Sequence, residues 1–171
     1  NKVACCRMNL DLMVPIVNPE TRVVSPAAEA RATNACNEIR LTPCNWSVGL
    51  LLPGLTRCSE RFAHAQAAAD LARIACALER YRLAHAEYPE SLGVLVPQFM
   101  ERIPHDIIGG QPLKYRRTDD GQFLLYSVGW NGTDDGGKVA LEERNKTARP
   151  VKGELALSFT AGDWVWRYPV N

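Results

Sequence analysis

AQAAADLARIACALERYRLAHAEYP (residues 65–89), PLKYRRTDDGQFLLYSVG (112–129) and WNGTDDGG (130–137) are the three pieces of sequence that decide the fold. The first has the period of a helix and ends in a Tyr-Pro pair. The second is typical of two strands around a turn, and the third is an acidic, glycine-rich loop. None of the three contains an obvious catalytic group.

The helical piece carries two apolar rows. The main row has alternating spacings of four and three residues, which places its members on one helix face: Ala67, Leu71, Ile74, Leu78 and Tyr81. The smaller row comprises Ala69, Ala72, Cys76 and Leu83. We therefore expect a helix from about Ser59 that is covered on two sides, with Cys76 as a small core residue rather than a nucleophile. The helix should end before Pro89, because a residue preceding proline avoids the α region.

The remainder of this region predicts strands. Leu113 to Arg117 and Phe123 to Val128 form a hairpin, and Ser91 to Val96 is a short helix. Further strands are expected at Val139 to Leu141, at Leu155 to Phe159 and in an aromatic segment from Gly162. The predicted fold class is α+β: a long amphipathic helix packed on an antiparallel sheet of three to five strands, spanning 59–171.

Residues 1–58 predict a separate, partly helical extension that contains cysteines. Ser25 is placed to cap a helix, with Pro26 at its first position and Glu29 in its first turn. This helix should run to about Arg40. Short extended segments are expected around Met13 to Val17 and after Arg22, and residues 41–58 read as an irregular connector.

Composition limits the functional classes. The 171 residues have a formal net charge of +1, which argues against a nucleic-acid partner. No run of sequence approaches the roughly 20 apolar residues of a membrane span. The chain opens on Asn1, so we expect a processed or truncated piece whose membrane or targeting segment lay upstream.

The six cysteines lack a Cys-x-x-Cys pair, and the histidines do not stand at zinc-finger spacing, which argues against a structural zinc site. Disulfides in an oxidising compartment and buried free thiols remain alternatives for Cys5, Cys6, Cys36, Cys44, Cys58 and Cys76.

The acidic loop is the most chemically distinctive stretch. Calcium prefers several oxygen ligands, and neighbouring carboxylates on a glycine-rich turn can supply them. The loop lacks the spacing of an EF-hand. The alternative is a solvated turn in which Asn and Asp favour the loop conformation.

Two other functions compete with metal binding. A small esterase or peptidase could use His105 or His85 with a serine, either Ser91 or Ser127, and Asp106. No nucleophile-elbow motif surrounds either serine. The second alternative is a carbohydrate-binding surface, but strand tryptophans are more often core. The tryptophans concerned are Trp130, Trp164 and Trp166.

The order of these motifs resembles the C-terminal domain of the type II secretion major pseudopilin, general secretion pathway protein G. The matching residues are Tyr88-Pro89 at the helix end, Leu92 and Leu95, Pro104 and Asp106 in the next loop, Tyr115, and Ser127 and Gly129 before the acidic loop. The resemblance covers about residues 63–137, with a looser echo at Gly162 to Trp166. Ala86 stands where the family usually has glycine, and Ile107 where it usually has proline.

The resemblance implies a pseudopilin-like fold and a calcium ion in the acidic loop. Its ligands would be Asn131, Asp134, Asp135 and the later Asp163. It also implies a structural or interaction domain that is not an enzyme and lies outside the cytoplasm, in the periplasm, on the cell surface or secreted. Protein partners or self-assembly would follow from such a role.

Overall fold

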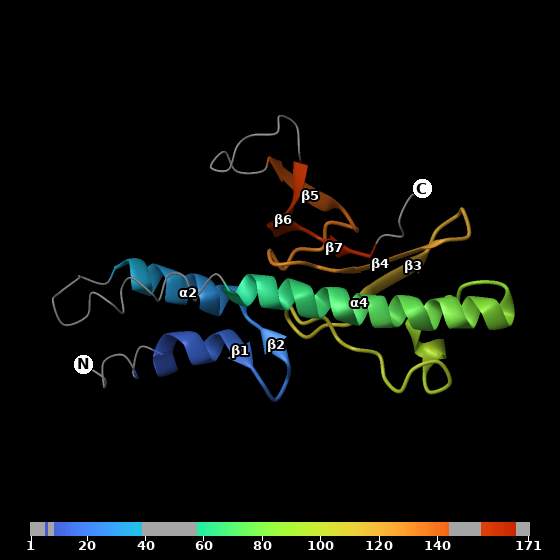
Figure 1. Ribbon diagram of the computed structural model, residues 1–171, viewed down its shortest axis with the longest axis horizontal. Helices are drawn as coiled ribbons and strands as arrows, with labels where there is room; N and C mark the ends of the chain where they lie inside the picture. Colours follow the sequence, from blue (N-terminus) through green and yellow to red (C-terminus); the bar gives the residue numbers. More distant parts are fainter. Residues whose placement is uncertain (1–5, 7–8, 39–57, 144–154, 167–171) are drawn as a thin grey trace.

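The computed structural model describes residues 6, 9–38, 58–143 and 155–166 of the chain. It is an α+β protein in which one long helix, α4, lies along a small antiparallel sheet (Figure 1). The helical elements are η1 Asn9–Met13, η2 Val14–Ile16, α2 Pro26–Asn37, α4 Cys58–His85 and η3 Leu92–Leu95. The strands are β1 Val17–Asn18, β2 Val23–Val24, β3 Lys114–Arg117, β4 Phe123–Ser127, β5 Val139–Glu143, β6 Leu155–Gly162 and β7 Trp164–Val165.

Helix α4 confirms the main apolar row. Ala67, Leu71, Ile74 and Leu78 are buried, and Tyr81 packs at the edge of the core. The helix ends at His85, ahead of Pro89 as predicted. The next residue, Ala86, has a positive φ of 65°, and its N–H donates a 2.7 Å hydrogen bond to the carbonyl of Arg82. This is the left-handed cap that usually ends a helix with glycine.

The smaller apolar row of α4 is not buried as predicted. Among the described residues, Ala69 and Cys76 are exposed and the Leu83 side chain is 77% exposed. The prediction that Cys76 is a core residue is therefore wrong. Additional burial on α4 falls instead on alanines beside the main row, namely Ala63, Ala75 and Ala77.

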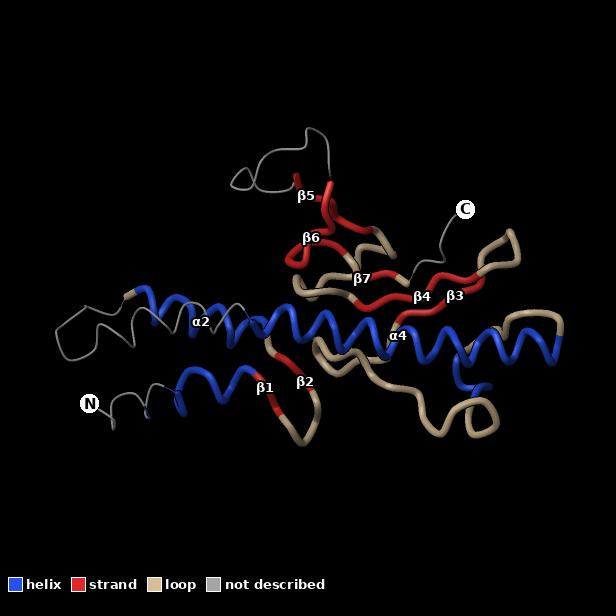
Figure 2. Tube along the Cα trace, viewed as in Figure 1, coloured by secondary structure: helices blue, strands red, loops and turns tan. Residues whose placement is uncertain are grey.

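Within the described residues, the main sheet has three strands in the order β3-β4-β7, all antiparallel (Figure 2). The β3–β4 hairpin pairs Lys114 with Tyr126 and Arg117 with Phe123. β5 and β6 form a separate antiparallel pair. All the strands expected after Leu113 are confirmed, although the last is shorter than predicted within the described residues.

The first core joins the C-terminal half of α4 to β4. Ile74, Leu78, Leu95 and Leu125 are almost completely buried in it. Tyr88 closes the core at the helix end, where its ring meets Phe123 edge-on at 4.8 Å. The Tyr-Pro pair therefore both stops the helix and supplies a core side chain.

The N-terminal region begins α2 as predicted. The Ser25 hydroxyl accepts a 3.2 Å hydrogen bond from the N–H of Ala28, and Pro26 takes the first helical position. α2 ends at Asn37, and Arg40 lies outside the described residues, as do residues 41–57 of the expected connector. The segment Met13 to Val17, predicted to be extended, instead begins with short helical turns.

A second core shows how this region meets α4. Its apolar side chains come from both parts of the chain: Ile16, Val24, Ala28, Ala32, Ala63, Ala67, Ile108, Trp130 and Trp164. The N–H of Val24 also donates a 2.8 Å hydrogen bond to the carbonyl of Ile107. The extension thus packs against the same helix that carries the sheet.

Candidate functional site

The acidic loop between β4 and β5 is fastened to the sheet by Asp163, immediately before β7. Asp163 Oδ2 accepts a 2.6 Å hydrogen bond from the N–H of Gly137, and Oδ1 accepts one of 3.3 Å from the N–H of Asp135. The Asp163 side chain is 2% exposed. Burial raises the pKa of this carboxyl, although the two amide donors act to lower it.

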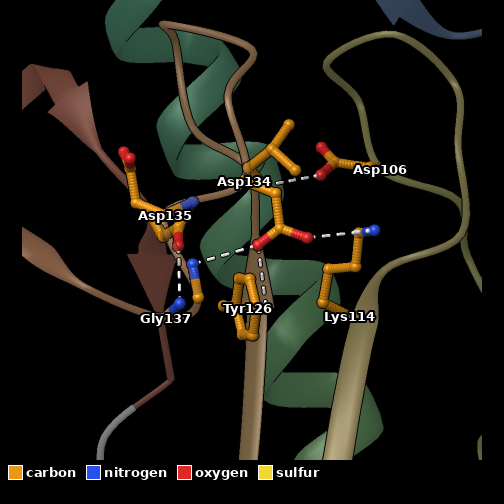
Figure 3. Close-up of polar contacts among 9 residues, drawn as sticks. Asp106, Lys114, Tyr126, Asp134, Asp135 and Gly137 are labelled. Atoms are coloured by element: carbon orange, nitrogen blue, oxygen red, sulfur yellow. Dashed lines mark hydrogen bonds and ion pairs between the residues drawn. The ribbon is translucent and has the colours of Figure 1, made fainter.

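Asp134 points to the opposite side of the loop, toward β3 (Figure 3). Its Oδ2 lies 3.1 Å from the ammonium of Lys114, and its Oδ1 accepts 3.0 Å hydrogen bonds from the Tyr126 hydroxyl and the Gly136 N–H. These donors, with the Gly136 amide foremost, hold the pKa of the Asp134 carboxyl below its ordinary value. Burial and the hydrogen bond to Asp134 raise the pKa of Tyr126 to about 12.

Asn131 and Asp135 close the loop on itself. The Asn131 amide donates a 3.1 Å hydrogen bond to Asp135 Oδ2, while its oxygen accepts one of 3.0 Å from the N–H of Thr133. The structure therefore brings the four predicted ligands into one loop region but directs Asp134 away from the others. Within the described ranges, no three acidic, histidine or cysteine side chains gather as a metal would need.

Sequence reasoning missed Lys114, to which the hypothesis of a metal-binding acidic loop gave no role. The signal was available in the hairpin. The register that pairs Lys114 with Tyr126 places its side chain at the mouth of the loop. A lysine there supplies positive charge to the clustered carboxylates without a metal ion.

Asp106, a member of the alternative hydrolase site, is a buried hydrogen-bond acceptor. Its Oδ1 accepts hydrogen bonds from the Ile108 N–H at 2.9 Å and the Ser127 hydroxyl at 2.8 Å. Its Oδ2 accepts one of 3.0 Å from the N–H of Val128. The carboxylate thus ties the loop after η3 to the end of β4.

Among the described residues, neither candidate histidine is hydrogen-bonded to Asp106 or Ser127. His85 stacks on Tyr81 with ring centroids 4.0 Å apart, and its Nδ1 lies 3.0 Å from the Tyr81 carbonyl oxygen. His105 is exposed. Ser127 shares its hydroxyl with Asp106 and the Gly129 N–H, so its two contacts are structural.

The tryptophans belong mainly to the core. Trp130 and Trp164 are buried in the second core, and Trp166 packs at the edge of the first. The preference for core over a sugar-stacking surface is confirmed for Trp130 and Trp164. Among the described cysteines, Cys6, Cys36 and Cys76 carry free thiols. Of these three, Cys36 is the buried one, and burial raises the pKa of its thiol.

Comparisons with protein-family models, with curated proteins and with solved structures found no match for this chain. In the described part of the chain, no helix combines the length and apolar character needed to cross a bilayer.

Proposed function

We propose that this chain is a pseudopilin-like structural or interaction domain that acts outside the cytoplasm. The observation that supports it is the placement of the residues that carry the resemblance. They are the contacts that join the helix, the following loop and the sheet. In this proposal the exposed acidic loop is the element that contacts protein partners.

Particular hydrogen bonds and apolar contacts make these connections between the elements. The Tyr115 hydroxyl on β3 donates a 2.6 Å hydrogen bond to the carbonyl of Pro89, next to the helix end. Leu92 and Leu95 are buried in the first core. Asp106 and Ser127 form the buried pair described above. Ala86 also adopts a glycine-like backbone at the position where the family usually has glycine.

Calcium is the second part of the proposal. Asn131, Asp134, Asp135 and Asp163 offer the oxygen donors that this hard cation prefers. Lys114 already neutralises Asp134, so in this proposal calcium competes with the lysine for the loop. Asp106 and Ser127 have structural roles here, and we assign no catalytic residue.

Thermal unfolding with calcium and with a chelator tests this idea. Calcium at about ten times its Kd should stabilise the fold by about 1.4 kcal/mol, which is a rise of a few degrees in Tm. Asp134→Ala and Asp135→Ala should abolish the rise. Lys114→Met should enlarge it, because the competing ammonium is removed while the side-chain stem is kept.

Asp119→Ala is the matched control, since Asp119 is an exposed carboxylate in the β3–β4 turn rather than the loop. It should keep the full calcium response. An identical Tm with calcium and chelator, both in the native chain and in Lys114→Met, would exclude the metal. The proposed structural role would then be tested separately, by measuring whether the acidic loop binds a partner protein or a second copy of this chain.

A further inference from the structure

The smaller apolar row of α4 belongs to a longer repeat on the outward face of the helix. With Phe62 and Ala65 it has alternating spacings of three and four residues, interrupted once by Glu79. We call this repeat the outer row: Phe62, Ala65, Ala69, Ala72, Cys76 and Leu83. Two positions along a helix correspond to a turn of about 200°. The buried Ala67 and Ile74 stand two positions from the four central members, so the outer row lies opposite the core.

The outer row is open to solvent. Phe62 is 74% exposed and Leu83 is 77% exposed, and between them Ala65, Ala69 and Cys76 are also exposed. Alanine is common on exposed helix faces because it favours the helix, but phenylalanine has no such preference. A helix that is apolar on opposite faces is normally covered on both. The outer row therefore has the composition of a contact surface.

The charged residues beside the outer row are mainly arginines. They flank it on both sides: Arg61 and Arg82 on one, Arg73 and Arg80 on the other. The two nearby carboxylates are already paired, because Asp70 Oδ1 lies 3.2 Å from Arg73 and Glu79 Oε2 lies 2.8 Å from Arg82. The flanks thus carry a net positive charge. Charges beside an apolar helix seam decide which partner it accepts.

We propose that the outer row binds one α-helix of a partner protein, whose own apolar row of leucine-sized side chains is flanked by glutamate or aspartate. The small side chains between Phe62 and Leu83 leave room for the larger apolar side chains of the partner, as holes for knobs. The acidic flanks pair with the arginines. A second copy of this chain would instead bring two sets of arginines together, which repel. This proposal depends neither on calcium nor on the pseudopilin-like role.

Two designed helical peptides, mixed with the full chain, test the charge requirement. Both have heptads with leucine at positions a and d; the acidic peptide has glutamate at positions e and g, and the basic peptide has lysine there. Fluorescence anisotropy measures binding. At low salt the acidic peptide should bind about ten times more tightly, and this preference should shrink at about 1 M NaCl. Arg61→Glu combined with Arg73→Glu should abolish the preference.

The thiol of Cys76 reports whether the peptide lies on the outer row. With acidic peptide at about ten times its Kd, alkylation of Cys76 by iodoacetamide should slow about tenfold. Alkylation of the exposed Cys6, which lies outside α4, should not change. Mass spectrometry distinguishes the two thiols.

Two variants that each add one arginine to α4 locate the surface independently. Ala69→Arg places a charge inside the outer row and should weaken binding about tenfold or more, because the contact would have to bury it. Ala84→Arg, at an exposed position beside the row, is the matched control and should bind as the native chain does. Equal binding of the two peptides, unchanged alkylation of Cys76, or equal binding by the two variants overturns the proposal. A dimer in sedimentation that Ala69→Arg dissociates also overturns it, because the outer row would then belong to a second copy.

Discussion

The Ser127 hydroxyl donates a 2.8 Å hydrogen bond to Oδ1 of Asp106, and both side chains are buried. The two residues come from different parts of the fold, one from the loop after η3 and the other from the end of β4. The same carboxylate accepts the N–H groups of Ile108 and Val128. A serine and an aspartate that suggested catalysis in the sequence thus form a structural joint.

Asp106→Ala should be strongly destabilising. It removes the acceptor of three buried donors, and each buried donor left unpaired costs about 1–3 kcal/mol. Ser127→Ala removes one donor to the carboxylate, which keeps two others, and the acceptor of the Gly129 N–H, so its cost should be nearer 1–2 kcal/mol. Urea unfolding followed by circular dichroism measures both. Equal losses in the two variants would contradict a joint centred on Asp106.

Gly129→Ala should be far more damaging than Gly132→Ala. Both glycines have positive φ, near 70°, so alanine costs about 1–2 kcal/mol of backbone strain at either position. At Gly129, however, an added Cβ would lie 2.2 Å from the carbonyl oxygen of Gly162, whereas nothing lies within 4 Å at Gly132. Urea midpoints should therefore fall slightly for Gly132→Ala and severely for Gly129→Ala. Similar midpoints would show that the two backbones are not packed this closely.

The fold could be predicted where the signal is local. The four-three spacing of Leu71, Ile74 and Leu78 specifies a buried helix face without knowledge of its partner. The same reasoning failed at Ala69 and Cys76. Alanine is the strongest helix former, so its presence on a helix reports propensity as well as burial. A row of small residues therefore predicts that a segment is helical more securely than it predicts that this face of the helix is buried.

The residues of the candidate site could be predicted from the sequence, but the hydrogen bonds among them could not. The acidic loop was visible as a cluster, and Asp163 entered through the family resemblance. That Asp163 binds the amides of Asp135 and Gly137 depends on β7 pairing with β4, a long-range contact that no local pattern encodes. The direction of Asp134 toward Lys114 likewise follows from the hairpin register.

Ala86→Gly should stabilise the protein. Ala86 has a φ of 65° after the last residue of α4, a conformation that costs an alanine about 1–2 kcal/mol and glycine almost nothing. The greater freedom of glycine in the unfolded chain offsets part of the gain, so we expect about 0.5–1 kcal/mol. Ala84→Gly, two residues earlier at an exposed position inside the helix, is the control and should destabilise by about 1 kcal/mol. The two Tm changes should have opposite signs, and a fall in both would show that Ala86 is not strained.

His64 should make the fold sensitive to mild acid. Burial lowers the pKa of its imidazole below the ordinary 6.5. Well above pH 6.5 the ring is neutral in both states and contributes no pH dependence. Below pH 6.5 the unfolded chain takes up a proton that the folded state resists, so the free energy of unfolding decreases until the pH passes the folded-state pKa.

His64→Phe should therefore flatten the loss of stability between pH 7 and pH 5 by up to one proton (a slope of about 1.4 kcal/mol per pH unit) while keeping an aromatic ring against Trp164. His105→Gln, a change at an exposed histidine, is the matched control and should leave the slope as it is in the native chain. Urea unfolding at a series of pH values in this window measures the slopes. An unchanged slope in His64→Phe would mean that His64 takes up its proton as readily in the folded protein as in the unfolded chain.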